Sequence, residues 1–452
     1  MQCPHCNAQL EDDTVFCGNC GTQITRVQAQ GAKVPYKGGE GEDDLATVIS
    51  TRQSYQPPTP QTPVRNNALQ PDTPYRGGDT PTILSSPPPA RKNNTWRIAF
   101  IVVLVLLIIG VGTIGTIALL NKQNHTSVTN NRSSNTPIAS NANGTVSFSD
   151  SQNVSGHSNA VTINVRGLAT PPSGSQYNAW IVDTQSERPT GLGTLIQNKD
   201  GTYTTKSTNH HHNILSLGNK VVVTLEQGTV TVATGRVILS AVFPPNAFVH
   251  IKHLLVSFPD TPGKIGLLVG LVDQAQKMSS ASQLLQSISA SQNSSAIRCA
   301  AQSIIDIAEG TQGSHYKPLA NQCASENIAE VGDGYGLLGN GGYIANGQAH
   351  ASLAATQSDT TVTIRVHAGH VATSLENMKG WVNTIDHDAQ ALLNNPTDSA
   401  KVQEIVTLAN HAFNGFDANG DGSIDPIPGE GGSVTAYYHG QLMAALVLAP
   451  GS

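Results

Sequence analysis

Residues 98–120 read IAFIVVLVLLIIGVGTIGTIALL, a stretch without a single charged residue. An α-helix rises about 1.5 Å per residue, so about 20 residues cross the roughly 30 Å hydrocarbon core of a bilayer. A buried core helix is the alternative, but such helices rarely stay apolar on every face over this length. We therefore predict one transmembrane helix over residues 98–120, in a multi-domain membrane protein arranged around it.

The charges beside this segment predict its orientation. Arg91, Lys92 and Arg97 lie close to its N-terminal end, and the C-terminal flank is poorer in Lys and Arg. Because positively charged flanks stay in the cytoplasm, we expect residues 1–95 to be cytoplasmic. Residues 122–452 are then expected outside the cell.

Composition argues against one class of partner. The chain has 25 Lys and Arg against 31 Asp and Glu, a net charge of −6. A general nucleic-acid binder needs a basic excess to neutralise phosphates, so we expect no direct nucleic-acid binding. Four of the six cysteines lie within the first 20 residues, which favours a metal site over a disulfide-rich scaffold.

The cysteines of residues 1–24 are spaced as zinc ligands. Cys3 and Cys6 form one CxxC pair, and Cys17 and Cys20 form a second. Four thiolates at tetrahedral corners make a closed structural Zn²⁺ site. Disulfides are disfavoured in the cytoplasm, and a redox CxxC would need a βαβ context that is absent. The segment resembles the short N-terminal zinc ribbons (CPxC…CxxCG) of bacterial membrane proteins.

Residues 25–95 are rich in Pro, Thr, Gln and Gly, a composition typical of a disordered linker. Two patches in it, DDLATVI at 43–49 and DTPTIL at 79–84, place a Thr between acidic and branched aliphatic residues. Phosphorylation there would create a ligand for a phosphothreonine-binding protein. Chance in a Thr-rich linker is the alternative.

A polar stalk over 121–144 leads into a region, 145–258, whose pattern is typical of strands. Short runs such as VTINV, NAWIVD, KVVVTLE, GRVILSAVF and FVHIKHLLVSF are separated by turn residues. Strands at this spacing predict an antiparallel β-sandwich.

Several segments of this region match one known family in order and spacing. They are YNAWIVD (177–183), GLGTL (191–195), VTLEQG (223–228) and TGRVIL (234–239). With them the region resembles the extracellular C-terminal domain of the anti-sigma-K factor family. The resemblance implies a single-pass protein whose outer β domain receives a signal and whose cytoplasmic part holds a sigma factor. Residues 1–95 differ from the family in carrying a zinc ribbon and a linker.

Residues 259–452 change to a helical period and predict an all-α bundle. The candidate helices cover 264–289, 295–309, 346–357, 361–393, 399–413 and 433–448. Two pseudo-repeats are visible. SIIDIAEG (303–310) precedes VGDGYGLLGNGG (331–342), and TLANHAFNG (407–415) precedes IPGEGGSVTAYYHGQ (427–441). Each unit is expected to form a helix, an acidic loop, a Gly-rich turn and a second helix.

The loop of the second pseudo-repeat has the spacing of a calcium loop. Oxygen donors fall at loop positions 1, 3, 5, 7 and 9, on Asp417, Asn419, Asp421, Ser423 and Asp425. Gly422 stands at position 6, where such loops turn sharply. The segment resembles the calcium loops of EF-hand and dockerin-like modules, although position 12 is Pro428, and Glu430 can substitute from two residues further. An Asx-turn-rich loop without an ion is the alternative to Ca²⁺.

Two further groups of residues in the outer region have a predicted role. Cys299 and Cys323 are expected to form a disulfide in an oxidising compartment, with buried free thiols as the alternative. Histidines are scattered over the helical region and are expected to be polar surface residues, since no Glu-x-x-His pair accompanies them. They are His350, His367, His370, His387, His411 and His439. The run His210–His212 is expected in a solvated polar loop.

We recognise no Ser–His–Asp set, nucleotide loop or glycosidase-type carboxylate pair, so the sequence does not predict an enzyme. It predicts a bacterial single-pass membrane protein with a regulatory or sensor function. Its expected partners are the membrane and, in the cytoplasm, a sigma factor or a phosphothreonine-binding protein. The alternative is a calcium-binding structural or adhesive protein of the cell envelope, and a cell-surface hydrolase ranks third.

Overall fold

The computed structural model describes residues 23–24, 141–151, 157–209, 212–319, 323–339 and 341–451, all within one compact unit. The four ribbon cysteines, the linker and the predicted membrane segment 98–120 lie outside the described residues. Among the helices that are described, none is both long enough and apolar enough to span a bilayer.

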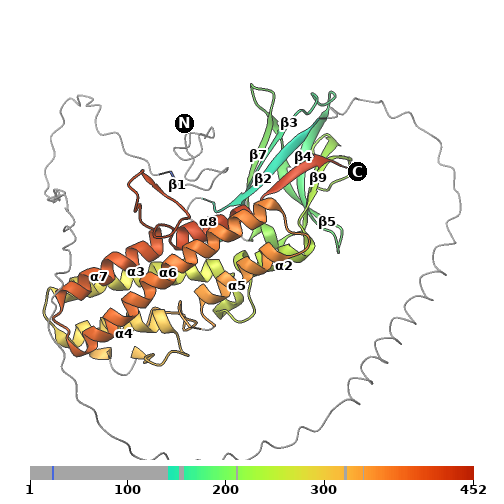
Figure 1. Ribbon diagram of the computed structural model, residues 1–452. Helices are drawn as coiled ribbons and strands as arrows, with labels where there is room; N and C mark the ends of the chain where they lie inside the picture. The colour runs from blue at the N-terminus through green and yellow to red at the C-terminus, as the bar shows by residue number, and fades with distance from the viewer. Residues whose placement is uncertain are drawn as a thin grey trace, which may run out of the picture. The chain divides into compact units, whose positions relative to one another are not determined.

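One antiparallel sheet dominates the first half of this unit (Figure 1). Its strands are β2 (Asn143–Ser149), β3 (Ala160–Arg166), β4 (Ser175–Asp183), β5 (Arg188–Thr194), β6 (Ile196–Gln197), β7 (Tyr203–Thr208), β8 (Lys220–Gln227), β9 (Arg236–Val242) and β11 (Leu446–Pro450). Their spatial order is β5-β4-β8-β9-β11-β2-β3-β7-β6. The two edge strands, β5 and β6, are separated in the chain by Leu195 alone, so the sheet curls back towards its own edge.

This arrangement corrects the predicted sandwich. The strands are antiparallel, as expected, but the nine of them form one continuous near-barrel sheet instead of two stacked sheets. Period-2 burial explains why the strands form. In β2, Val146 and Phe148 face the core while their neighbours face outward, and Ile163 and Val165 of β3 do the same.

Two expected boundaries between the sheet and the helical region are wrong. The run FVHIKHLLVSF, expected to be a strand, lies mainly in α2 (Pro245–Leu255). Phe248, Ile251 and Leu255 recur at helical spacing and are all buried, and the Asp359 carboxylate accepts hydrogen bonds from backbone N–H groups of the first turn. Apolar, β-branched composition favoured a strand, but the 3.6-residue period decided the structure.

The second wrong boundary is at the C-terminal end. The last helix was expected to cover 433–448, but α8 (Ser433–Met443) ends earlier, and β11 inserts between β9 and β2. The chain therefore returns to the sheet after the helical region, and the divisions 145–258 and 259–452 are not independent folding units.

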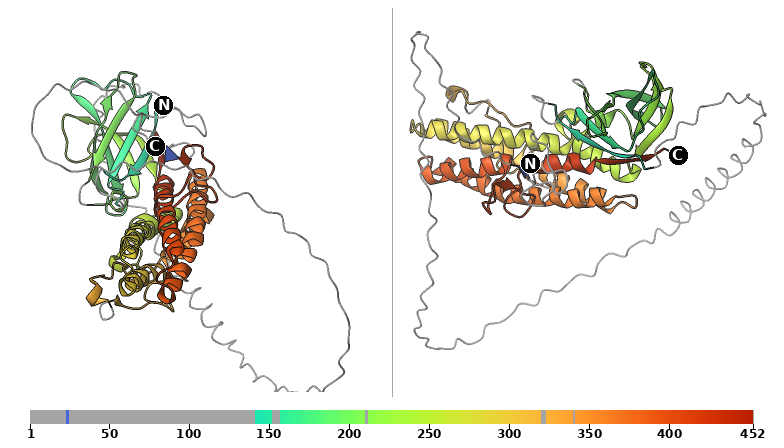
Figure 2. Two further views of the ribbon diagram at one scale, coloured as in Figure 1. Left: turned by 90° about the vertical axis from the view of Figure 1, so that its left-hand side faces the viewer. Right: turned by 90° about the horizontal axis from the view of Figure 1, so that it is seen from above.

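The helices form a bundle with the sheet at one end (Figures 1 and 2). Besides α2 and α8 they are α3 (Leu267–Ser289), α4 (Ser294–Glu309), α5 (Tyr343–Thr356), α6 (Val362–Asn394) and α7 (Ser399–Asn414). Short 3₁₀ turns occur at Ile214–Ser216, Pro262–Lys264 and Ala324–Glu326. Helices α3, α4, α6 and α7 pack side by side, α2 packs on α5, and α8 packs on α6. One continuous apolar core joins the bundle to the sheet.

The two pseudo-repeats share their backbone geometry. Helices α4 and α7 each end on a glycine with positive φ, Gly310 (φ 67°, ψ −178°) and Gly415 (φ 87°, ψ −179°), a conformation that an L side chain rarely adopts. The next residue donates its backbone N–H across the loop in both units: Thr311 to the Gly334 carbonyl (2.8 Å) and Phe416 to the Glu430 carbonyl (2.9 Å). The following helices, α5 and α8, each begin after a glycine.

A second, two-stranded sheet joins distant parts of the chain. β1 (Gln23–Ile24) pairs antiparallel with β10 (Ser423–Ile424), which lies in the loop predicted to bind calcium. A single membrane crossing between these strands would place them on opposite sides of the bilayer. The pairing and the predicted topology therefore cannot hold in the same state of the protein.

Candidate metal centres

Three histidines converge between α6 and α8. His367 and His370 are three residues apart and so share a face of α6, while α8 supplies His439. The Nδ1 atom of His439 lies 2.9 Å from Nδ1 of His367 and 3.3 Å from Nδ1 of His370. His367 and His439 are buried, and His370 is partly buried. The three residues, called the α6–α8 cluster below, correct the expectation that they are dispersed surface side chains.

The spacing of the α6–α8 cluster fits a tetrahedral metal ion. Zinc–imidazole bonds are about 2.0–2.1 Å long, which puts two nitrogen ligands of a tetrahedral site about 3.3 Å apart. Without an ion, the single proton that Nδ1 of His439 can carry cannot serve both neighbouring Nδ1 atoms equally. A metal ion instead accepts the lone pairs of all three. Three protein ligands leave a fourth position for water or another group.

The protonation state of the cluster suits metal binding. Burial and, to a smaller extent, the adjacent His370 lower the pKa of His367 to about 4. Burial also lowers the pKa of His370, with the nearby Asp425 carboxylate acting in the opposite direction. Neutral imidazole is the form that coordinates metals. These ligands are therefore available without first losing a proton at neutral pH.

Helix α8 is held in place by a polar network at the junction with the sheet. Asp150, at the end of β2, accepts hydrogen bonds from the Tyr437 hydroxyl (2.7 Å) and the Gln441 amide (3.0 Å). Tyr437 is buried, and the hydroxyl of Ser158 lies 3.2 Å from its own. Since these side chains flank His439 on α8, the position of His439 is fixed relative to the sheet.

The other predicted histidines do not join this cluster. The ring of His411 stacks on Phe416 (centroids 4.5 Å apart) and meets Trp381 edge-on. The side chain of His387 is 79% exposed. His387 fits the expected surface role, whereas His411 is partly buried. His210 and His211 lie outside the described residues.

The loop predicted to bind calcium is stabilised by its own backbone. The Asp417 carboxylate accepts hydrogen bonds from the N–H groups of Gly420 and Gly422, and the side chain of Asp421 accepts one from Ser423. Among the described residues, the groups of three or more His, Cys, Asp or Glu whose ligand atoms come within 4.8 Å of one another contain histidines only. Calcium binding by Asp417, Asn419, Asp421, Ser423 and Asp425 thus stays a prediction.

Glu430 has the place that the sequence suggested for it. Its carboxylate is buried and accepts hydrogen bonds from the backbone N–H of Asp425 (2.9 Å) and of Asn419 (3.3 Å). Burial raises its pKa, and the charges of Asp425 and Asp421 raise it further. A cation in the loop would relieve this repulsion.

Cys299 of α4 and Cys323 are joined by a disulfide, with their Cα atoms 5.7 Å apart. Both cysteines are buried. The bond ties α4 to the long loop of the first pseudo-repeat, the unit without the calcium-type spacing.

A polar cleft of 920 Å³ opens beside that loop and contains carboxylates that the sequence did not single out. Glu309 lies 2.6 Å from Nδ1 of His315. The Gln390 amide donates to Asp386 (2.8 Å) and to Glu309 (3.5 Å). Burial, with the charge of Glu309, raises the pKa of Asp386 to about 6.

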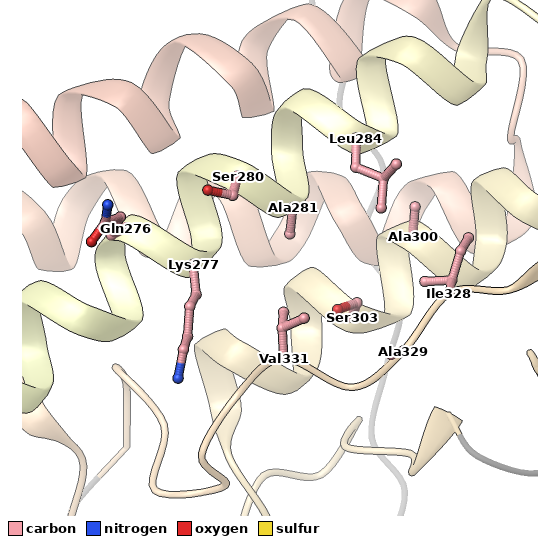
Figure 3. Close-up of a pocket in the computed structure, with 10 residues that line it drawn as sticks. All are labelled: Gln276, Lys277, Ser280, Ala281, Leu284, Ala300, Ser303, Ile328, Ala329 and Val331. Atoms are coloured by element: carbon pink, nitrogen blue, oxygen red, sulfur yellow. The ribbon is translucent and has the colours of Figure 1, made fainter.

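An apolar pocket of 290 Å³ lies between α3, α4 and residues 328–331 (Figure 3). Leu284 and Ile328 project towards one another across it. Its one charged lining residue, Lys277, pairs with Asp273 (2.8 Å). With no imidazole, thiol or carboxylate in its lining, this pocket does not suit a metal ion.

Comparisons with known proteins identify one part of the chain. A family model for the zinc-ribbon domain matches residues 2–24, so the N-terminal segment is a zinc ribbon. No curated protein and no solved structure matches the chain. The ribbon model covers the segment with Cys3, Cys6, Cys17 and Cys20, which supports a structural zinc ion there.

Proposed function

We propose that this protein binds a divalent first-row transition-metal ion, such as Zn²⁺, through the α6–α8 cluster. The observation that carries the proposal is the convergence of three largely buried imidazoles with Nδ1 atoms 2.9 and 3.3 Å apart. Imidazole ligands suit Zn²⁺, Cu²⁺ and Ni²⁺, whereas Ca²⁺ and Mg²⁺ prefer oxygen. Metal binding, rather than catalysis, is the function that the described residues support best.

The experiment is a zinc titration of the untagged full-length chain carrying Cys17→Ser and Cys20→Ser, which leaves only two thiolates in the ribbon. His439→Ala in this background should lower the bound zinc by one equivalent, because two imidazoles rarely retain the ion at micromolar concentration. His370→Ala should do the same with less risk to folding, since His370 is only partly buried.

The matched control is His387→Ala, on the same helix α6 but with an exposed side chain. It should leave the zinc content unchanged. If His439→Ala and His370→Ala both fold and both retain all the zinc of the parent, the cluster is not a metal site.

We further propose that metal binding outside the cell is the signal for a single-pass regulatory protein. The uncharged segment 98–120, the basic residues before it and the resemblance to anti-sigma-K factors support this proposal. The cytoplasmic partner would be a sigma factor or a phosphothreonine-binding protein that contacts residues 1–95. A pulldown with those residues separates regulation from the structural or adhesive alternative, for which partners are expected outside the cell alone.

Topology is tested by protease added to intact spheroplasts. If residues 98–120 cross the membrane once, the protease should remove residues 122–452 and leave the zinc ribbon intact. Loss of the ribbon as well would place both parts on the same side, where the β1–β10 pairing can form. An epitope before Cys3 and one after Pro450 make the two outcomes distinguishable on a blot.

Calcium binding by the second loop is a separate candidate function, favoured by the buried Glu430 carboxylate beside Asn419 and Asp425. Since Pro428 replaces the usual ligand at position 12, we expect a Kd on the order of 10⁻⁴–10⁻³ M. At 1 mM, Ca²⁺ should then stabilise the full chain by roughly 0.4–1.4 kcal/mol. The test compares the melting temperature of the full chain in Ca²⁺ with that in chelator. If the two temperatures are equal, and are equal for Asp421→Ala as well, the loop is an ordinary Asx turn without an ion.

A further inference from the structure

A second group of three histidines lies where α2 packs on α5. His250 and His253 share a face of α2, and His350 comes from α5. The Nδ1 atom of His350 is 3.1 Å from Nδ1 of His250 and 3.3 Å from Nδ1 of His253. All three side chains are partly buried. This α2–α5 cluster repeats the arrangement of the α6–α8 cluster, in which one central imidazole faces a pair three residues apart.

The likeness extends to the positions of the histidines in their helices. His250 and His253 are the sixth and ninth residues of α2, and His367 and His370 are the sixth and ninth residues of α6. The central histidines lie on α5 and α8, the helices that follow the Gly-rich turns of the two units. Before the first unit a Pro-containing break separates α2 from α3, whereas α6, which precedes the second unit, runs on without interruption.

The surroundings of the two clusters differ. The Phe258 ring covers one side of the α2–α5 cluster, with its centroid 5.1 Å from that of His350 and 5.5 Å from that of His253. The Gln357 amide nitrogen lies 3.2 Å from Nε2 of His250. The charges that act on His253 and His350 come from the other histidines of the cluster. In the α6–α8 cluster, by contrast, His439 is fully buried and Asp425 acts on His370.

We propose that His250, His253 and His350 form a second binding site for a divalent first-row transition-metal ion, which exchanges with solvent faster than the ion of the α6–α8 cluster. The ligand spacing matches the roughly 3.3 Å of a tetrahedral site. Partial exposure leaves the fourth position open to water or to an incoming chelating group. The proposal extends the proposed function to a second site, and the experiment reads the two sites separately.

The placement of the two sites gives the second ion a structural effect. Helix α2 begins soon after β9 ends, and α8 runs almost directly into β11, while β9 and β11 are neighbours in the sheet. An ion between α2 and α5 therefore fixes the helix that follows β9, and an ion between α6 and α8 fixes the helix that precedes β11. Loading both sites should bind the sheet to the bundle more firmly than loading either one.

The test is a Co²⁺ titration of the untagged full-length protein carrying Cys17→Ser and Cys20→Ser, followed by visible absorption. The parent should bind two equivalents, His350→Ala one, His439→Ala one, and the double variant none. His253→Ala, on the more open α2 face, should also bind one equivalent. This second variant keeps the proposal testable if His350→Ala misfolds. When excess chelator is added to the parent, the ion of the α2–α5 cluster should dissociate at least tenfold faster than the ion of the α6–α8 cluster. The ion that His350→Ala lacks identifies the first of these.

Each result has a distinct meaning. Two equivalents in both His350→Ala and His253→Ala would overturn the second site. Two equivalents in His439→Ala with one in His350→Ala would overturn the α6–α8 site and keep the second. Equal release rates for the two ions would overturn the exchange part of the proposal. The control variant His387→Ala should bind two equivalents like the parent, because the His387 side chain is exposed on α6.

Discussion

The full-length chain carrying Cys17→Ser should lose the zinc ion of its ribbon and the fold of residues 2–24. Structural Zn²⁺ in such small domains contributes an apparent binding free energy of about 10–16 kcal/mol, and that energy is the folding free energy of the segment. Three cysteines cannot complete the tetrahedral thiolate shell. Metal analysis should therefore show one zinc fewer than in the parent, and limited proteolysis should cut within the ribbon.

The matched control for this variant is His5→Ala, which lies inside the first CxxC pair but is not expected to bind the metal. It should keep the zinc and the protease resistance. Retention of the full zinc content by Cys17→Ser would show that Cys17 is not required for zinc binding and would contradict the closed four-thiolate site.

Replacing both Cys299 and Cys323 by Ala should destabilise the helical region by about 3 kcal/mol. The disulfide closes a loop of about 25 residues, and the cross-link lowers the entropy of the unfolded chain by an amount of this size. It also holds the long loop of the first pseudo-repeat against α4. Denaturant unfolding of the full chain, followed by tryptophan fluorescence, measures the loss.

Reduction of the parent supplies the control for the disulfide. A reductant should lower the stability of the parent to that of the double variant and leave the variant itself unchanged. Both cysteines are buried, so reduction should require partial unfolding first. A double variant as stable as the oxidised parent would show that the bond does not stabilise the native state.

Local patterns predicted much of the fold. Alternating polarity in β3 and the 3.6-residue period of α3, α4, α6 and α7 depend on near neighbours in the chain, and these elements formed close to the expected residues. The predictions were wrong where contacts between distant parts of the chain determined the secondary structure. The strand β11 is a short apolar run that could equally end a helix, and it pairs because β2 and β9 offer it two edges. Helix α2 depends on Asp359, more than 100 residues away, to cap its first turn.

The candidate sites divide in the same way. The ribbon ligands and the calcium-type loop were recognisable from the sequence because each set lies within a few turns of chain, where spacing alone fixes which residues can meet. The histidine clusters were not, because their closest pairs are separated by 69 to 100 residues. His367 and His370 are spaced to share one face of a predicted helix, whereas His250 and His253 lie in a run that was predicted as a strand. In neither case does anything local indicate which helix supplies the third imidazole. The packing of α5 on α2 and of α8 on α6 supplies the third imidazole of each cluster. This packing turns polar residues that were expected at the surface into candidate metal ligands.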